Sequence, residues 1–165
     1  MPSALVISFS HLAADPRVSR QIDWLAEGYA VTAAGLTSPG RPGVRFIPIA
    51  PAAGGRGLRG LRLLTRRFER VYWDMAGPAF AALAGERPDL IVANDLDALP
   101  LAVRLGAAAG APVVYDAHEF APREFDDSWK WRLLRGPYAT ELTRRYVPRA
   151  AAVTTVGEAI ADAFA

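Results

Sequence analysis

The chain has 165 residues, which is enough for one domain with a sizeable buried core. Apolar residues make up 52% and charged residues 22% of the sequence, so a disordered chain is excluded, and no apolar run approaches the roughly 18 to 20 residues of a membrane-spanning helix. Cysteine is absent, which excludes disulfide scaffolds, thiolate zinc sites and cysteine nucleophiles, and the net charge is only +2. The N-terminus also lacks a secretory signal, and we therefore expect a cytoplasmic protein.

Strand-like and helix-like segments alternate from the N-terminus onwards. Residues 4–9 form a short apolar run that is typical of a buried parallel strand. Asp15, directly before a proline, indicates an N-cap and the start of a helix that ends near Gly28. Further strands are predicted at residues 29–36 and 44–49.

The second half of the chain continues this alternation. A long helical region is predicted over residues 58–85, interrupted at Pro78 because proline lacks an amide donor. There follow a strand at 89–94, a helix at 98–109, a strand at 112–116, a loop at 118–129, a helix ending near Pro148, a strand at 151–156 and a helix opening at Gly157.

This order of elements predicts an α/β fold. Strands separated by helices imply a Rossmann-like, doubly wound and mainly parallel sheet of about six strands with helices on both faces. We expect one domain over residues 1–165. The sequence stops inside an amphipathic segment, which indicates a piece of a longer chain or the edge of a domain.

The turn after the first strand argues against a dinucleotide cofactor. Residues 10–15 contain no glycine, whereas the G-x-G-x-x-G turn uses glycines to bring the backbone against a pyrophosphate. The second strand also ends without an acidic residue for a ribose hydroxyl. No P-loop and no G-x-S-x-G elbow is present, so we expect no cofactor and neither a P-loop ATPase nor a serine hydrolase.

Polar side chains follow three of the predicted strands at the edge where α/β sheets bind ligands. They are His11 and Asp15 after the first strand, Asn94, Asp95 and Asp97 after the fourth, and Asp116, His118 and Glu119 after the fifth. His118 could bond a sugar hydroxyl or a phosphate, or could be satisfied by Asp116 or Glu119. Asp95 could bind hydroxyls, and Asp97 is the better candidate for a helix cap. Two nearby carboxylates do not make a metal site, so no metal is predicted.

Two arginines lie in the first turn of the helix that begins after Asp15. Free amides and the helix dipole favour an anion at this position, where Arg17 could add a bidentate phosphate contact. Alternatively, Asp15 caps the helix, and Arg17 and Arg20 are solvated.

Residues 57–73 combine an apolar stripe with an arginine-rich face. At about 100° per residue, apolar side chains from Leu58 to Tyr72 fall on one side of a helix. The opposite side carries Arg56, Arg59, Arg62, Arg66, Arg67 and Arg70. This pattern fits a core-facing helix with a solvated exterior, or a surface for anionic lipid or a polyanionic acceptor. Nucleic-acid binding is disfavoured because no aromatic stacking pattern accompanies the arginines.

Taken together, three parts of the chain resemble the N-terminal domain of family 4 glycosyltransferases, which have the two-Rossmann GT-B architecture. They are DPRV at 15–18 with LAEGYAVT at 25–32, DLIVANDLD at 89–97 with VYDAHE at 114–119, and VTTVGEAI at 153–160. The likeness extends over almost the whole chain. Many relatives place a Gly-Gly turn after the first strand, where this sequence has Leu12-Ala13-Ala14, which puts donor contacts from that loop in doubt.

The resemblance implies transfer of a sugar from a nucleotide-sugar donor to a glycan or lipid-linked acceptor, with retention at the anomeric carbon. The N-terminal domain then shapes the acceptor side, and the donor-binding domain with its paired glutamates lies outside this chain. The resemblance places His118 near the reacting centre. We further expect ligand contacts from His11, Asp15, Arg17, Asn94, Asp95 and Glu119, and a membrane or polyanion surface at Arg59, Arg62, Arg66 and Arg70.

Two alternatives remain open. One is a non-catalytic acceptor-binding or membrane-docking subunit of a split glycosyltransferase, peripheral at the inner face of the membrane. The other is a nucleotide-sugar epimerase with GT-B architecture, which would act without an acceptor.

Overall fold

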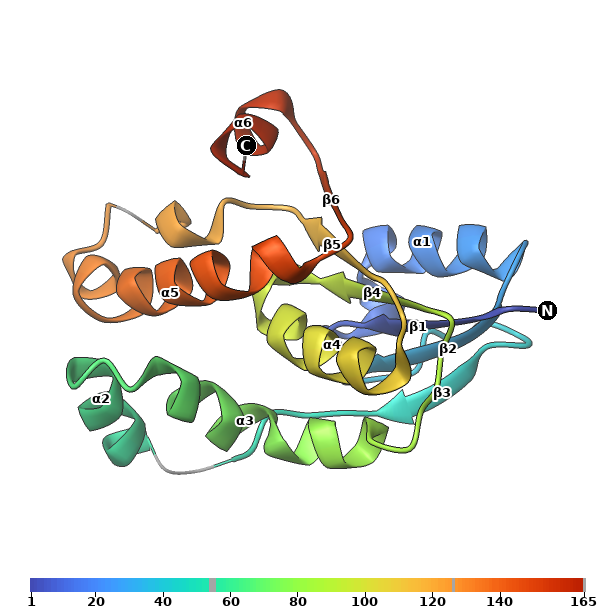
Figure 1. Cartoon of the computed structure of the whole chain (residues 1–165), viewed down its shortest axis with the longest axis horizontal. Coiled ribbons are helices and arrows are strands. Elements are labelled where there is room, and N and C mark those ends of the chain that lie inside the picture. Colours follow the sequence, from blue (N-terminus) through green and yellow to red (C-terminus); the bar gives the residue numbers. More distant parts are fainter. Residues whose placement is uncertain (54–55, 126, 165) are drawn as a thin grey trace.

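Six strands form one all-parallel sheet in the computed structural model, which describes residues 1–53, 56–125 and 127–164 and, within 56–59, the backbone (Figure 1). The strand order is β3-β2-β1-β4-β5-β6. The strands are β1 (Ser3–Ile7), β2 (Ala30–Gly35), β3 (Arg45–Pro48), β4 (Leu90–Asn94), β5 (Val113–Ala117) and β6 (Ala152–Thr155). This topology confirms the predicted doubly wound, Rossmann-like sheet.

Helices cover both faces of the sheet, as the alternating pattern predicted (Figure 1). They are α1 (Pro16–Ala26), α2 (Arg56–Leu64), α3 (Phe68–Leu83), α4 (Asp95–Ala109), α5 (Gly136–Tyr146) and α6 (Glu158–Phe164). The larger core lies between the sheet and α3, α4 and α5, whereas α1 packs on the opposite face in a smaller core. In the described part of the chain, no helix is both long and apolar enough to cross a membrane.

The central strands are apolar because they are buried on both sides. In β1, Leu5 and Ile7 belong to the larger core, and Val6 between them belongs to the smaller one. In β4, Ile91 belongs to the larger core and Val92 to the smaller one. Strands buried on both faces give continuous apolar runs, which is why the sequence identified them.

The helix that follows β1 begins where the sequence predicted. Asp15 is its N-cap and accepts a hydrogen bond from the Val18 amide at 3.2 Å, and Pro16 occupies the first helical position. Val18 and Ile22 are fully buried against the sheet. The helix ends at Ala26, two residues before the predicted stop at Gly28.

The predicted long helix over residues 58–85 is in fact two helices, and the predicted interruption at Pro78 is wrong. The chain breaks after Leu64, where Arg66 adopts a positive φ of 54° and the Arg67 amide bonds back to the Arg62 carbonyl, as at many helix ends. Pro78 lies inside the continuous helix α3. Gly77 precedes it and has no Cβ to clash with the proline ring.

The break also disrupts the predicted apolar stripe. Leu61 and Leu64 in α2 are 57% and 62% exposed, whereas Val71 and Tyr72 in α3 are buried. The single amphipathic helix is therefore a wrong prediction, since the two halves of its stripe face different surroundings.

The start of α4 also differs from the prediction. The helix begins at Asp95, three residues before the predicted start at residue 98, and its N-cap position is Asn94. Asp97 therefore lies in the first turn and is not the cap. Other element boundaries in the second half lie close to the predicted ones.

Candidate functional site

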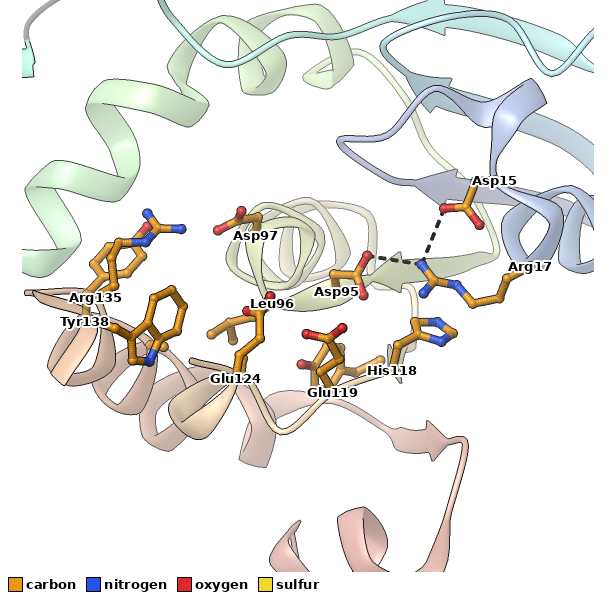
Figure 2. A pocket seen from close by; sticks show the side chains of 14 residues that line it. Asp15, Arg17, Asp95, Leu96, Asp97, His118, Glu119, Glu124, Arg135 and Tyr138 are labelled. Carbon is orange, nitrogen blue, oxygen red and sulfur yellow. Dashed lines mark hydrogen bonds and ion pairs between the residues drawn. The ribbon is translucent and has the colours of Figure 1, made fainter. Parts of the chain in front are cut away.

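A cavity of about 350 Å³ opens at the carboxyl-terminal edge of the sheet. It lies between the N-termini of α1 and α4 and the segment that connects β5 to α5 (Figure 2). Its lining includes Asp15, Arg17, Asp95, Asp97, Tyr115, His118, Glu119, Glu124, Trp131, Arg135 and Tyr138. Five predicted site residues, Asp15, Arg17, Asp95, His118 and Glu119, are thus brought together here.

His118 directly follows β5 and is held by a carboxylate of that strand. Its Nε2 lies 3.1 Å from Asp116 Oδ2, and both side chains are largely buried. Asp116 also accepts hydrogen bonds from Gln21 Nε2 at 3.1 Å and from the Thr154 hydroxyl at 2.7 Å. With Nε2–H donated to Asp116, the neutral imidazole keeps the Nδ1 lone pair for another partner. His118 therefore both lines the cavity and makes the carboxylate contact that sequence reasoning offered as an alternative.

Asn94 does not line the cavity, but it supports the His118 network through Gln21. Its side chain is buried, and Nδ2 donates to Gln21 Oε1 at 2.9 Å. His11 also lies outside the lining, exposed on the loop after β1, where it pairs with Thr37 as an isolated bridge. Of the predicted ligand contacts, these two are the ones that the structure does not bring to the cavity.

Arg17 is paired with carboxylates. Its Nη2 lies 3.1 Å from Asp95 Oδ2 and 3.6 Å from Asp15 Oδ2 (Figure 2). Partial burial raises the pKa of Asp95, and the nearby Arg17 guanidinium opposes that rise. Asp95 also has a positive φ of 64°, a conformation that non-glycine residues rarely adopt and that is often retained at functional sites. Because Arg17 already faces two carboxylates, it attracts a phosphate less strongly than the sequence suggested.

An acidic pair lies on the wall opposite α1. Desolvation, followed by the influence of the neighbouring Glu119 carboxylate, raises the pKa of Glu124 to about 7. Asp97 adds to the negative field at this pair. In the described part of the chain, no three His, Cys, Asp or Glu side chains are arranged to hold a metal ion.

Sequence reasoning missed most of the wall between β5 and α5. Glu124, Trp131, Arg135 and Tyr138 all line the cavity, although none was predicted to do so. Their one sequence signal was the mixture of charged and aromatic residues after His118.

The arginines of the predicted basic face have different environments. Arg62 forms an ion pair with Asp74 of α3, whereas Arg66 and Arg70 are exposed. The side chain of Arg59 lies outside the described residues. Arg66 also lines a groove of about 800 Å³, together with Phe68, Phe120, Pro122, Arg123, Trp131, Arg132, Gly136, Pro137, Thr140, Glu141, Thr143 and Arg144.

Solved glycosyltransferase structures share this fold. The SsfS6 glycosyltransferase of Streptomyces sp. SF2575 matches with a TM-score of 0.55 at 17% identity, over 94% of this chain and 50% of that one. The same enzyme complexed with thymidine diphosphate matches with a TM-score of 0.51 at 18% identity, over 90% of this chain and 44% of that one. CalG4, the calicheamicin glycosyltransferase, gives 0.52 at 16% identity, over 90% and 41%. The chain spans half or less of the length of these neighbours.

A search of curated proteins gave no significant match. The family comparison is more specific, because the glycosyl transferase 4-like domain family matches residues 14–165. That match covers the strand-end residues other than His11, the His118 network and α1 to α6, and it confirms the resemblance seen in the sequence. The chain belongs to the glycosyl transferase 4-like domain family.

Proposed function

We propose that this chain is the N-terminal, acceptor-side half of a retaining glycosyltransferase that moves a sugar from a nucleotide-sugar donor to a glycan or lipid-linked acceptor. The observation that carries the proposal is the cavity at the sheet edge, where His118 meets Asp95 and Glu119 in a domain of this family. The thymidine diphosphate bound by one structural neighbour supports a nucleotide-sugar donor. A further domain, outside this chain, supplies most of the donor contacts.

In this proposal His118 acts on the sugar next to the reacting bond. Asp116 fixes the ring by accepting a hydrogen bond from Nε2–H, so that Nδ1 accepts a hydrogen bond from a hydroxyl group in the cavity. Asp95 and Glu119 accept hydrogen bonds from acceptor hydroxyls, and the ion pair with Arg17 favours the ionised form of Asp95 and holds its side chain in place. These residues contribute to the rate by holding the acceptor in place before the reaction. Hydrogen-bond donors that stabilise the charge developing on the leaving diphosphate would come mostly from the domain outside this chain.

The test is the His118→Ala variant of the full-length protein, assayed with uridine, thymidine and guanosine diphosphate sugars by release of the nucleoside diphosphate. We expect kcat/KM to fall about 100-fold, which is typical for loss of a positioned acid–base or hydrogen-bonding group. The Asp116→Asn variant should show a smaller loss, since the ring stays in place while the preferred tautomer is no longer fixed.

The matched control is Arg41→Ala, which removes an exposed ion pair with Asp23 away from the cavity and should keep wild-type kcat/KM. Unchanged transfer by His118→Ala would remove His118 from the mechanism. If the wild-type protein consumes none of these donors, the glycosyltransferase proposal itself is wrong.

One surface favours a second role, docking to an anionic membrane. Apolar side chains are exposed on α2 and on the segment before α5, which lie at the same end of the molecule and contact each other (Figure 1). They are Leu61, Leu64, Phe125, Trp129 and Leu133, each more than half exposed. The same segments and the start of α3 also carry exposed cations, namely Arg66, Arg67, Arg70, Arg123, Lys130 and Arg132. Exposed apolar side chains that can enter the headgroup region, together with exposed cations on the same segments, are what an anionic lipid surface binds.

Sedimentation with vesicles tests this docking surface. The full-length protein should bind phosphatidylglycerol-containing vesicles at least 10-fold more tightly than pure phosphatidylcholine vesicles. The Leu64→Ser/Trp129→Ser variant should lose most of this binding, whereas Val156→Ser, which changes an exposed apolar residue on another part of the chain, should keep it. Equal binding of both vesicle types would exclude the proposed surface.

A further inference from the structure

The cavity is lined by more acids than bases. Its carboxylates are Asp15, Asp95, Asp97, Glu119 and Glu124, and its bases are Arg17, Arg135 and the imidazole of His118. With the histidine neutral, the five carboxylates outnumber the two guanidinium groups. The groups that face a ligand therefore create a negative potential, although the whole chain carries a net charge of +2.

Arg17 is paired with carboxylates, whereas Arg135 lies over aromatic rings and lowers the pKa of Glu124 from a distance. Arg17 is bonded to Asp95 and lies near Asp15. Arg135 lies over two aromatic rings, with its central carbon 5.3 Å from the ring centre of Tyr138 and 5.9 Å from that of Trp131. The acids on the α5 side of the cavity, Asp97, Glu119 and Glu124, have no ion pair within the described residues.

The same wall carries a buried hydroxyl group. Tyr138 is 1% exposed, and among the described residues its hydroxyl has no hydrogen-bond partner. Its phenol group lies within the electrostatic influence of Asp97 and Arg135, and the side chain lines the cavity. A buried polar atom of this kind calls for a ligand or water to complete its hydrogen bonds.

Glu119 and Glu124 both line the cavity, and desolvation followed by the influence of Glu119 raises the pKa of Glu124, so that this carboxyl group holds a proton more readily when no ligand is present. An ammonium group can replace that proton, because it offers three donors and a positive charge to the surrounding oxygens. A phosphate group would face the same carboxylates at close range and would be repelled.

We propose that this cavity selects an acceptor that bears an amino group, an amino sugar or aminocyclitol, with its ammonium between Glu119, Glu124 and Asp97 and a hydroxyl group on Tyr138. The inference rests on the proposed function, whose acceptor class it specifies. The proposal excludes phosphorylated sugars as ligands of this cavity. Arg17 then holds Asp95 in place instead of binding a phosphate.

The experiment compares three probes that share one ring by calorimetry at pH 7, with the full-length protein and no donor. Glucosamine is cationic, glucose is neutral and glucose 6-phosphate is anionic. Glucosamine should bind at least 10-fold more tightly than glucose, as expected for hydrogen bonds to charged groups, and glucose 6-phosphate should bind more weakly than glucose. Equal affinity for glucosamine and glucose, tightest binding of the phosphate, or no binding of any probe would each overturn the inference.

Three variants make the result specific to the acidic pair. Glu124→Gln and Glu119→Gln keep the size of the side chain and remove one charge, and each should reduce the preference for glucosamine over glucose to less than 3-fold. Glu158→Gln removes an exposed charge from α6 and should leave the preference unchanged. The binding assay contains no nucleotide sugar, so a protein that prefers glucosamine but consumes no donor would disprove the proposed function and keep the cavity assignment.

Discussion

Replacement of Gly106 by alanine should destabilise the domain by about 2–3 kcal/mol, the upper part of the range for overpacking a filled core. Gly106 lies in α4, where the helix passes closest to β5 and to the turn between them. A Cβ at this position would lie 2.7 Å from Val113 Cγ2 and 2.8 Å from the carbonyl oxygen of Ala111. The backbone oxygen cannot rotate away as a side chain can, and it belongs to the turn in which the Ala111 amide donates to the Gly106 carbonyl. Relief of the clash must therefore move α4 away from the sheet.

Urea denaturation monitored by circular dichroism measures this change against a matched helical glycine. Gly60 lies in α2, and a Cβ added there would meet no atom of the described residues within 4 Å. Gly60→Ala should stabilise the domain by up to about 1 kcal/mol, because alanine loses less backbone entropy in a helix. If the two variants shift stability in the same direction, close packing of α4 on β5 does not limit the size of residue 106.

The sheet was predictable because its central strands are buried on both faces. Continuous apolar runs such as Leu5 to Ile7 arise only where both sides of a strand are covered, and the helices between them require parallel connections. The helix break at residues 65–67 was not predictable in this way. The apolar period continues across it, and only the structure shows that Leu64 is exposed while Phe68 packs against Tyr138.

The candidate site was likewise predictable only in part. Asp95, His118 and Glu119 could be placed from the sequence because each follows a strand, and parallel strands bring their carboxyl ends to one edge. Glu124 and Arg135 could not, because the segment after Glu119 has no period to follow. Its path depends on how α5 docks on the larger core through its buried side chains.

The geometry of the cavity depends on contacts between helices that are distant in sequence. Tyr72 of α3 places its hydroxyl inside the first turns of α4, where it donates to the Asp97 carbonyl at 2.9 Å and accepts from the Leu101 amide at 3.1 Å. These two backbone groups are four residues apart and would bond each other in a regular helix. The hydroxyl thus bridges a helical hydrogen bond, next to Pro100, which has no amide to donate. The same turn carries the Asp97 carboxylate that lines the cavity.

Tyr72→Phe should therefore destabilise the domain by about 3 kcal/mol, because it leaves a buried carbonyl and a buried amide without partners, and each such group costs about 1–3 kcal/mol. The tyrosine is 2% exposed, so water cannot easily replace the hydroxyl. Thermal and urea unfolding measure the loss, with Tyr29→Phe as the control, since the Tyr29 side chain is only partly buried and its hydroxyl bonds to none of the described residues in the structure. A loss below about 0.5 kcal/mol for Tyr72→Phe would mean that the Leu101 amide closes directly onto the Asp97 carbonyl. The first turn of α4 would then hold Asp97 in the cavity without help from α3.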